Sequence, residues 1–319
     1  MKRLAILTSG GDCSGMNACI RAAVRTAVRM KIEVVGFRKG YLGLMKGDAI
    51  PLDSKAVSGI LHRGGTFLQS ARALEFKTPE GQQQALSNLR EMGIDGMVVL
   101  GGDGSLTGAL ALHRLGFPVV GIPASIDNDI PFTDMALGVD TALNNILYAV
   151  DCIKDTASSH ARAFVIEVMG RNSGYLASIS AIATGAEYAL VPEQEYDLAE
   201  ICQQLRGRFA EGRDNAIIIV AEGAGHAQEI ANSIKDAIGF EVRVTVLGHY
   251  QRGGAPTVFD RLLASRFGKK SVELLISGVS GVMVGLSANN MLATPLDDVI
   301  RSEKRPHDEV LRMAEMLGI

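Results

Sequence analysis

The feature that most constrains this fold is a strand–glycine–helix–strand unit at residues 97–130. Residues 97–100 form a short apolar run that is typical of a buried strand. Three glycines and one acidic residue follow at once: Gly101, Gly102, Asp103 and Gly104. A helix-like segment at 105–115 and a second apolar run at 119–122 complete the unit. Glycines let backbone N–H groups approach an anion, and a helix N-terminus favours negative charge, so the unit predicts an α/β sheet that holds phosphate.

The second strand of the unit ends at Ser125, Asp127 and Asp129. These side chains fall where doubly wound sheets place their ligands. The glycine spacing matches neither the dinucleotide fingerprint nor a Walker A loop. Asp103 would repel phosphates unless a cation lay between them, which indicates Mg²⁺ bound to a nucleotide. A plain glycine turn with a capping Asp is the alternative for 101–104, and the nearby carboxylates weaken it.

Composition excludes several other classes of protein. The chain has 319 residues, enough for two domains, with 47% hydrophobic and 21% charged residues. A net charge of −3 and the absence of Trp argue against nucleic acid and anionic membranes as partners. The four cysteines have no metal-binding spacing, and no apolar run reaches membrane-spanning length. We therefore expect a cytoplasmic protein with reduced thiols.

A second glycine turn follows the first strand, residues 3–8, and precedes a helix at 15–30. This turn is similar to a second phosphate-contact loop, in which Gly11 would offer its backbone N–H. On the helix, Arg21 and Arg25 are four residues apart, which suits either a solvated stripe or an anion site.

Three further strands, at 163–169, 215–221 and 241–247, end near polar residues or glycine. Basic and acidic side chains flank them: Arg162, Arg171, Glu222, Arg243, His249 and Arg252. Arg162, Arg243, His249 and Arg252 together suit a dianionic phosphate. Tyr41 is open to two interpretations, a packing ring or part of a nucleotide pocket.

Several motifs together resemble the bacterial-type ATP-dependent 6-phosphofructokinases. They are GGDGS, IDNDI, LTSGGDCSGMNA, EVMGR and VLGHYQRGGAPTVFDR, and they extend over nearly the whole chain. The resemblance implies an α/β fold of two doubly wound, Rossmann-like domains with a cleft between them. It assigns residues 1–138 and 251–301 to ATP binding, and residues 139–250 and 302–319 to sugar-phosphate binding.

The resemblance also implies a reaction, in which MgATP phosphorylates the 1-hydroxyl of fructose 6-phosphate to give fructose 1,6-bisphosphate and ADP. Asp127 would be the base, Arg171 and Gly11 would stabilise the transferred phosphoryl group, and Asp103 would hold Mg²⁺. The nucleotide-binding residues would be Gly11, Tyr41, Arg72, Gly102, Asp103, Gly104, Ser105 and Gly108. The substrate-binding residues would be Ser125, Asp129, Arg162, Met169, Gly170, Arg171, Glu222, Arg243, His249 and Arg252.

By the same resemblance, the enzyme is a homotetramer in which Arg162 and Arg243 reach the sugar phosphate of a neighbouring subunit. An effector site for ADP or phosphoenolpyruvate would use Arg21, Arg25, Lys154, Gly185, Glu187 and Arg213. The Gly185 carbonyl and Glu187 would suit the Mg²⁺ of a nucleotide effector. Glu211 and Asp214 stand in a loop that is usually basic, so we expect weakened regulation. The plain alternative is that these side chains turn to solvent and the site works normally.

Three other functions stay open. Pyrophosphate-dependent members of the family typically carry Asp at the position of Gly104 and Lys at that of Ala124, and this chain has neither. A lipid or NAD kinase also uses a GGDG turn but leaves EVMGR and HYQRGG unexplained. A catalytically silent sensor would not need Asp103, Asp127 and Arg171.

Overall fold

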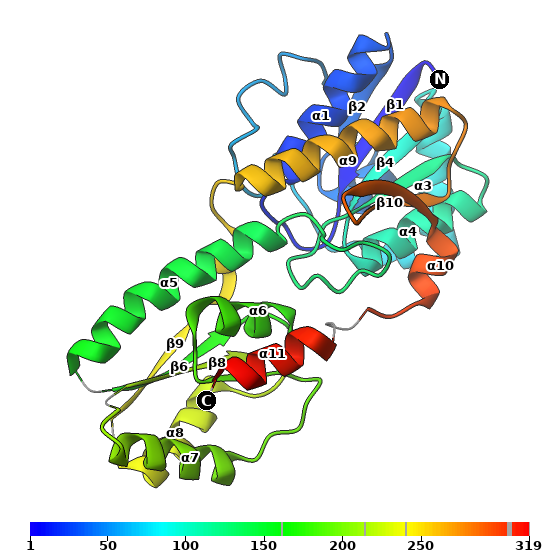
Figure 1. Cartoon of the computed structure of the whole chain (residues 1–319). Helices are drawn as coiled ribbons and strands as arrows, with labels where there is room; N and C mark the ends of the chain where they lie inside the picture. The colour runs from blue at the N-terminus through cyan, green and yellow to red at the C-terminus, as the bar shows by residue number, and fades with distance from the viewer. Residues whose placement is uncertain (161, 214, 240, 305–307, 319) are drawn as a thin grey trace. The chain divides into compact units, whose positions relative to one another are not determined.

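The structure is a computed structural model that describes residues 1–160, 162–213, 215–239, 241–304 and 308–318. The chain forms two compact units, each assembled from segments that are distant in sequence (Figure 1). The first comprises Met1–Ile126, Ile130–Thr141 and Arg252–Lys304. The second comprises Asp127–Asp129, Ala142–Gln251 and the C-terminal segment from residue 305.

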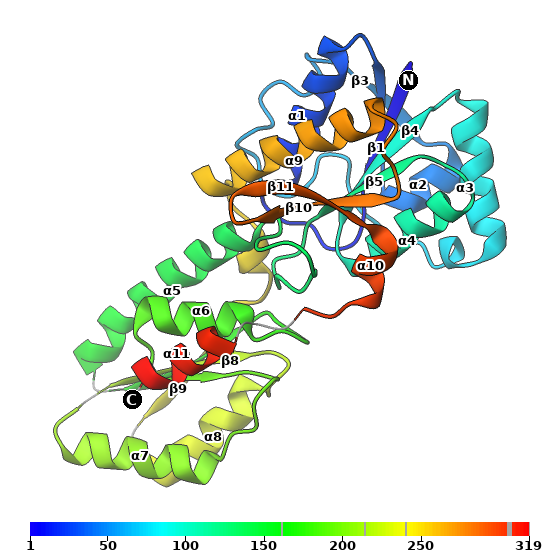
Figure 2. The same ribbon diagram turned by 45° about the vertical axis from the view of Figure 1, so that its right-hand side comes forward.

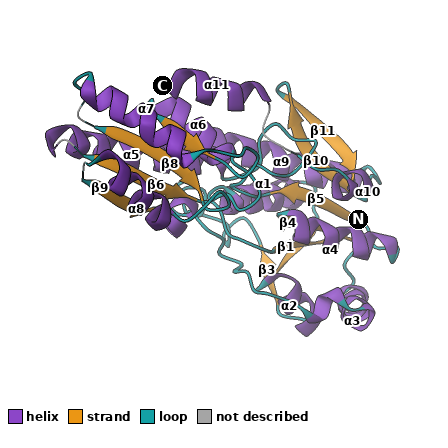
Figure 3. Cartoon of the chain, turned by 90° about the horizontal axis from the view of Figure 1, so that it is seen from below, coloured by secondary structure: helices purple, strands orange, loops and turns teal. Residues whose placement is uncertain are grey.

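The first unit contains a seven-stranded sheet in the order β11-β10-β5-β4-β1-β2-β3. Its strands are β1 (Arg3–Thr8), β2 (Glu33–Phe37), β3 (Ala49–Leu52), β4 (Gly96–Gly101), β5 (Val119–Pro123), β10 (Val282–Ser287) and β11 (Asn290–Pro295). The five inner strands run parallel, and the edge strands β3 and β11 are antiparallel to their neighbours. Figure 3 shows β10 and β11 as a hairpin at one edge.

The inner strands β1 and β4 are almost wholly apolar because helices cover both faces of this sheet. The helices are α1 (Met16–Arg29), α2 (Gly40–Lys46), η1 (Glu75–Lys77), α3 (Pro79–Glu91), α4 (Asp103–Arg114), α9 (Val258–Ile276) and α10 (Leu296–Arg301). Helices α1 and α9 lie side by side (Figure 2). One hydrophobic core joins Ala5 and Leu7 of β1 to residues of α2, α3, α4 and α10.

The second unit contains a four-stranded parallel sheet in the order β7-β8-β6-β9. Its strands are β6 (Ala163–Val168), β7 (Tyr188–Leu190), β8 (Ala216–Ala221) and β9 (Val242–Val246). Its helices are α6 (Tyr175–Thr184), α7 (Leu198–Ala210), α8 (Ala227–Ile238), η2 (Gly248–Arg252) and α11 (Asp308–Gly318). Helices α7 and α8 pack on one face through the core around Val165 and Ile218, while α6 and α11 pack together against β7 and β8. Helix α5 (Val139–His160) starts in the first unit and continues in the second.

These findings confirm the predicted class, an α/β fold built on parallel sheets with helices on their faces. Several elements differ from the prediction. Helix α4 begins at Asp103 instead of residue 105. The sequence patterns did not predict β3, β11, α2, α3, α8 or α10. Among the described residues no helix is long and apolar enough to cross a membrane.

Candidate active site

Two glycine turns lie next to each other in the first unit, at the carboxyl ends of β1 and β4. The strands pair in parallel with Thr8 opposite Leu100, and the Ser9 amide donates to the Leu100 carbonyl at 2.9 Å. A Cβ on Gly101 would lie 2.5 Å from the Ser9 carbonyl oxygen, so only glycine allows this approach. Strand β2 lies on one side of β1 and strand β4 on the other, so the strand order reverses at β1. The carboxyl ends of β1 and β4 therefore form the switch point where open α/β sheets bind ligands.

The N-terminus of α4 is the most open part of this edge. The amides of Ser105 and Leu106 are satisfied by the Gly102 carbonyl at 2.9 and 3.0 Å. A Cβ on Gly104 would meet no heavy atom within 4 Å. Asp103 occupies the first turn, and a Cβ on Gly102 would lie 4.0 Å from the Ser125 Cβ. The structure thus brings the predicted Asp103, Gly104 and Ser125 to one place.

Gly108 and Tyr41, both predicted to bind nucleotide, contact each other inside the fold. Tyr41 is only 4% exposed, its hydroxyl donates to the Ser105 carbonyl at 2.7 Å, and its ring stacks on Phe76 at 4.0 Å. Burial raises the pKa of this phenol. A Cβ on Gly108 would lie 2.7 Å from the Tyr41 ring. This geometry supports the interpretation of Tyr41 as a packing residue, whose ring and hydroxyl contact α4.

Two arginines stand beside the first glycine turn. A Cβ on Gly11 would lie 3.1 Å from Nη1 of Arg252, so that guanidinium group lies over the turn. The Ser70 hydroxyl donates to the Gly10 carbonyl at 2.7 Å, which fixes the segment that leads to Arg72. Arg72 itself is exposed. Arg252 therefore lies at the turn, and Arg72 follows a segment that is held to it.

In the second unit, other predicted residues gather at the carboxyl ends of β6 and β8. Met169, Gly170 and Arg171 follow β6, and Glu222 follows β8, where its amide donates to the Val168 carbonyl at 2.8 Å. The Ser173 hydroxyl donates to the Asp127 carbonyl at 2.9 Å, which brings the Asp127–Asp129 segment to the loop after β6. The Met169 amide donates to Gln251 at 3.2 Å, two residues after His249.

Arg162 and Arg243 lie near the amino ends of the strands, at the other end of that sheet from these loops. Arg162 precedes β6, and Arg243 is the second residue of the neighbouring β9. Both guanidinium groups pair with the Glu241 carboxylate, Arg162 at 2.5 Å. A strand rises about 3.3 Å per residue, so Arg162 and Met169 are separated by roughly 20 Å. One chain therefore does not assemble all the predicted phosphate-binding cations. Glu241 was missed because a lone carboxylate before a strand carries no pattern.

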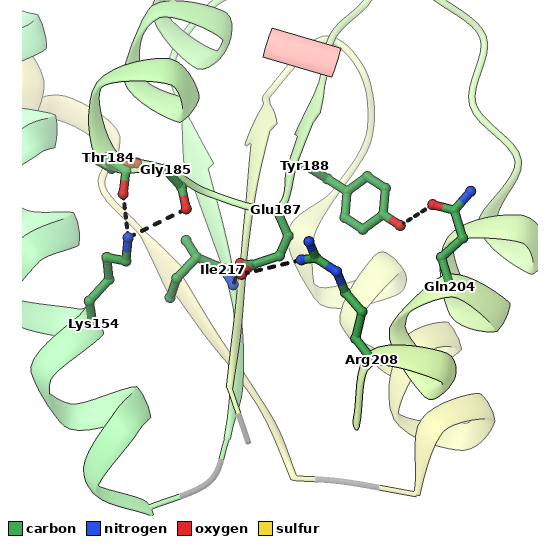
Figure 4. Close-up of polar contacts among 8 residues, drawn as sticks. All are labelled: Lys154, Thr184, Gly185, Glu187, Tyr188, Gln204, Arg208 and Ile217. Atoms are coloured by element: carbon green, nitrogen blue, oxygen red, sulfur yellow. Dashed lines mark hydrogen bonds and ion pairs between the residues drawn. The ribbon is translucent and has the colours of Figure 1, made fainter. Parts of the chain in front are cut away.

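Three predicted effector residues of the second unit, Lys154, Gly185 and Glu187, already have polar partners in the chain (Figure 4). Lys154 donates to the carbonyls of Thr184 and Gly185, the second at 3.4 Å. The Glu187 carboxylate accepts the Ile217 amide at 2.6 Å and faces Arg208 at 3.7 Å. Arg208 was not predicted, although it stands on the same face of α7 as Gln204, which the Tyr188 hydroxyl contacts at 2.6 Å. The two oxygen groups expected to suit Mg²⁺ are thus each faced by a cation of the same chain.

The remaining effector residues lie elsewhere. Arg21 and Arg25 are on α1 of the first unit, and Arg213 is exposed after α7. Asp214 lies outside the described residues. The described chain holds no cluster of three or more His, Cys, Asp or Glu side chains suited to a metal ion. A single carboxylate such as Asp103 still suits Mg²⁺, which commonly takes one or two carboxylates together with substrate phosphates.

Comparison with known proteins agrees with this arrangement. The phosphofructokinase family model matches residues 3–275. ATP-dependent 6-phosphofructokinases from Thermotoga neapolitana and Halalkalibacterium halodurans are 48% and 49% identical to the chain over 319 residues, with full coverage of both sequences. The solved phosphofructokinase from Saccharomyces cerevisiae matches with a TM-score of 0.89 and 35% identity, covering all of this chain and 48% of that one. The parallel sheets, the paired glycine turns and these full-length similarities show that the chain belongs to the phosphofructokinase family.

Proposed function

We propose that this protein is an ATP-dependent 6-phosphofructokinase. It transfers the γ-phosphoryl group of MgATP to the 1-hydroxyl of fructose 6-phosphate, a step of glycolysis. The observation that carries the proposal is the open N-terminus of α4 at Gly104, beside a second glycine turn and two arginines. Curated relatives with full-length similarity bear the name of this activity. The cysteines are free, and three of the four are buried, which supports a cytoplasmic location.

In the first unit, we assign ATP to the two glycine turns. The backbone amide of Gly11 binds phosphate oxygens, and the α4 N-terminus adds partial positive charge. Arg72 neutralises charge on the nucleotide phosphates. Asp103, with Ser125 nearby, would hold Mg²⁺, which would neutralise negative charge on the nucleotide phosphates.

In the second unit, we assign the sugar to the loops after β6 and β8. Asp127 accepts the proton of the 1-hydroxyl, and Arg171 stabilises the transferred phosphoryl group. Met169, Gly170, Glu222 and Asp129 orient the sugar. Its phosphate is bound by His249 and Arg252, which both belong to η2. The loop geometry supports the assignment, because the Ser173 hydroxyl ties the Asp127 backbone to the segment that carries Arg171.

The enzyme is proposed to act as a homotetramer. Arg162 and Arg243 lie near the amino ends of β6 and β9, whereas Met169 and Glu222 follow the carboxyl ends of β6 and β8. A second copy can supply them to the site. The test is to mix inactive Asp127→Ala and Arg243→Ala chains after mild dissociation. Recovery of activity is expected, since some hybrid sites then contain both intact residues. Full activity in a protein that is monomeric by analytical ultracentrifugation would refute the proposed homotetramer.

The effector site is proposed to respond weakly to ADP or phosphoenolpyruvate. Lys154 already binds the Gly185 carbonyl, and Arg208 faces Glu187. Titration of each effector at sub-saturating fructose 6-phosphate tests this. Strong regulation at micromolar effector would contradict it, and regulation that strengthens in a Glu211→Arg, Asp214→Lys variant would support it.

The donor is tested by a coupled assay with fructose 6-phosphate and either ATP or pyrophosphate. ATP should give the higher kcat/KM, because nothing fills the space at Gly104 and Ala124 offers no cation for pyrophosphate. Equal or better turnover with pyrophosphate would establish the alternative donor. If neither donor supports turnover, the protein would instead be a catalytically silent sensor that binds these ligands.

A further inference from the structure

Residues 252–257, the Arg252 strap, connect Arg252 to the start of α9 and are pinned along their length. The Ser14 hydroxyl contacts the carbonyls of Gly253 and Gly254 at 3.2 and 2.8 Å. The Arg261 guanidinium group donates to the Pro256 carbonyl at 2.7 Å. Ser14 is 1% exposed and lies three residues after Gly11. The strap is thereby bound to the glycine turn over which the Arg252 side chain lies.

The far end of the strap belongs to a network in which α5 and α9 cap each other. The Asp260 carboxylate accepts from the amides of Gly138 and Thr141 at 3.0 and 2.9 Å, and from the Thr141 hydroxyl at 2.5 Å. The Thr257 amide donates in turn to the Thr141 hydroxyl at 3.1 Å. The Thr257 hydroxyl donates to Asp140 at 2.5 Å and accepts the Asp260 amide at 3.2 Å. Both threonine hydroxyls are therefore used as donor and acceptor.

The cost of burial indicates that this network does more than end a helix. Asp260 is fully buried, and its hydrogen-bond partners are two amides and a hydroxyl. Burial raises the pKa of this carboxyl against the lowering effect of those hydrogen bonds and with a contribution from Asp140. A buried carboxylate is expensive, whereas a local Ser or Thr would cap α5 alone. The additional result of placing the acid on α9 is to fix the strap between the two helices.

We propose that Thr141 and Asp260 are positioning residues for Arg252. They act through the strap and hold the guanidinium group over Gly11, where an incoming anion meets it already oriented. Such preorganisation strengthens binding of an anionic substrate without any contact from the positioning residues themselves. The kinetic consequence rests on the proposed function, in which Arg252 binds the sugar phosphate.

Thr141→Val tests the proposal because it keeps the shape of the side chain and removes both hydrogen bonds of its hydroxyl. The KM for fructose 6-phosphate should rise about tenfold, while kcat and the KM for ATP stay within about threefold. Thr141→Ser should restore the wild-type KM. Ser271→Ala is the matched control, since Ser271 is a fully buried residue on α9 whose hydroxyl donates to the Gly268 carbonyl of its own helix. In an Arg252→Lys background Thr141→Val should add less than about twofold.

Equal rises in both KM values, or effects of the two substitutions that simply multiply, would overturn the proposal. If Thr141→Val does not fold, Thr257→Val breaks the same network from α9 and is judged by the same criteria. Amide hydrogen exchange adds a readout independent of activity. The Thr257 amide should exchange at least about tenfold faster in Thr141→Val and unchanged in Ser271→Ala. An inactive wild type would refute the proposed function alone, whereas unchanged exchange at Thr257 would refute the positioning role.

Discussion

Gly104 offers a sharp test because stability and nucleotide binding should respond to it in opposite directions. It lies in the first turn of α4, and apart from its own helix and chain neighbours a Cβ there would meet no heavy atom of the described residues within 4 Å. Gly104→Ala should therefore stabilise the ligand-free protein by about 0.5–1 kcal/mol through the lower entropy of the unfolded chain. For a unit of this size the melting temperature should rise by about 1–4 °C.

The same methyl group should weaken ATP binding, because only the proposed nucleotide can occupy the space it enters. Overpacking costs about 1–3 kcal/mol, so the KM for ATP should rise by about 5-fold to 150-fold. Gly104→Asp adds charge repulsion of about 3 kcal/mol at about 5 Å from a phosphate, which is more than a hundredfold. Its carboxylate is compatible with the α4 N-terminus, so the variant should fold.

The assay is thermal unfolding without ligand together with coupled kinetics at saturating fructose 6-phosphate. Gly207→Ala is the matched control, since Gly207 lies in α7 of the second unit and its Cβ would also meet nothing within 4 Å. It should give the stability gain with an unchanged KM for ATP. If Gly104→Ala behaves like this control, Gly104 does not face the nucleotide and the assignment of ATP to α4 is wrong.

Three further predictions concern other parts of the chain. Asp127→Ala should lower kcat by about 10²–10⁴-fold with little change in the KM for fructose 6-phosphate, as expected for loss of a positioned base, and near-normal turnover would remove Asp127 from that role. Arg208→Ala should strengthen the response to MgADP, because Glu187 loses its facing cation; an unchanged titration curve would show that Arg208 does not limit the site. In the native protein a thiol reagent should modify Cys152 alone, since the other three cysteines are buried and burial raises the pKa of Cys13, Cys19 and Cys202; mass spectrometry of the labelled chain would detect any second site.

Much of the fold was encoded locally and could be predicted from the sequence. The apolar runs of β1, β4 and β5 are buried on both faces, so their pattern alone identifies them. The glycines after β1 and β4 likewise predict close backbone approach, and the pairing of these strands places the two turns together. By contrast, the edge strands β3 and β11 were missed, because β3 is only four residues long and contains a proline, and β11 mixes polar and apolar residues.

Only the tertiary structure decided the roles that depend on contacts between distant residues. The sequence left Tyr41 between two interpretations, and its burial against Gly108, 67 positions later, supports packing. From the sequence alone, Asp260 is a residue in the first turn of a helix. Only the structure shows that its carboxylate accepts hydrogen bonds from the amides of Gly138 and Thr141. Arg162 and Arg171 flank strand β6 in sequence. Because the extended strand lies between them, they are found at its opposite ends. Local patterns determine which elements form, whereas the path of the chain determines which side chains meet.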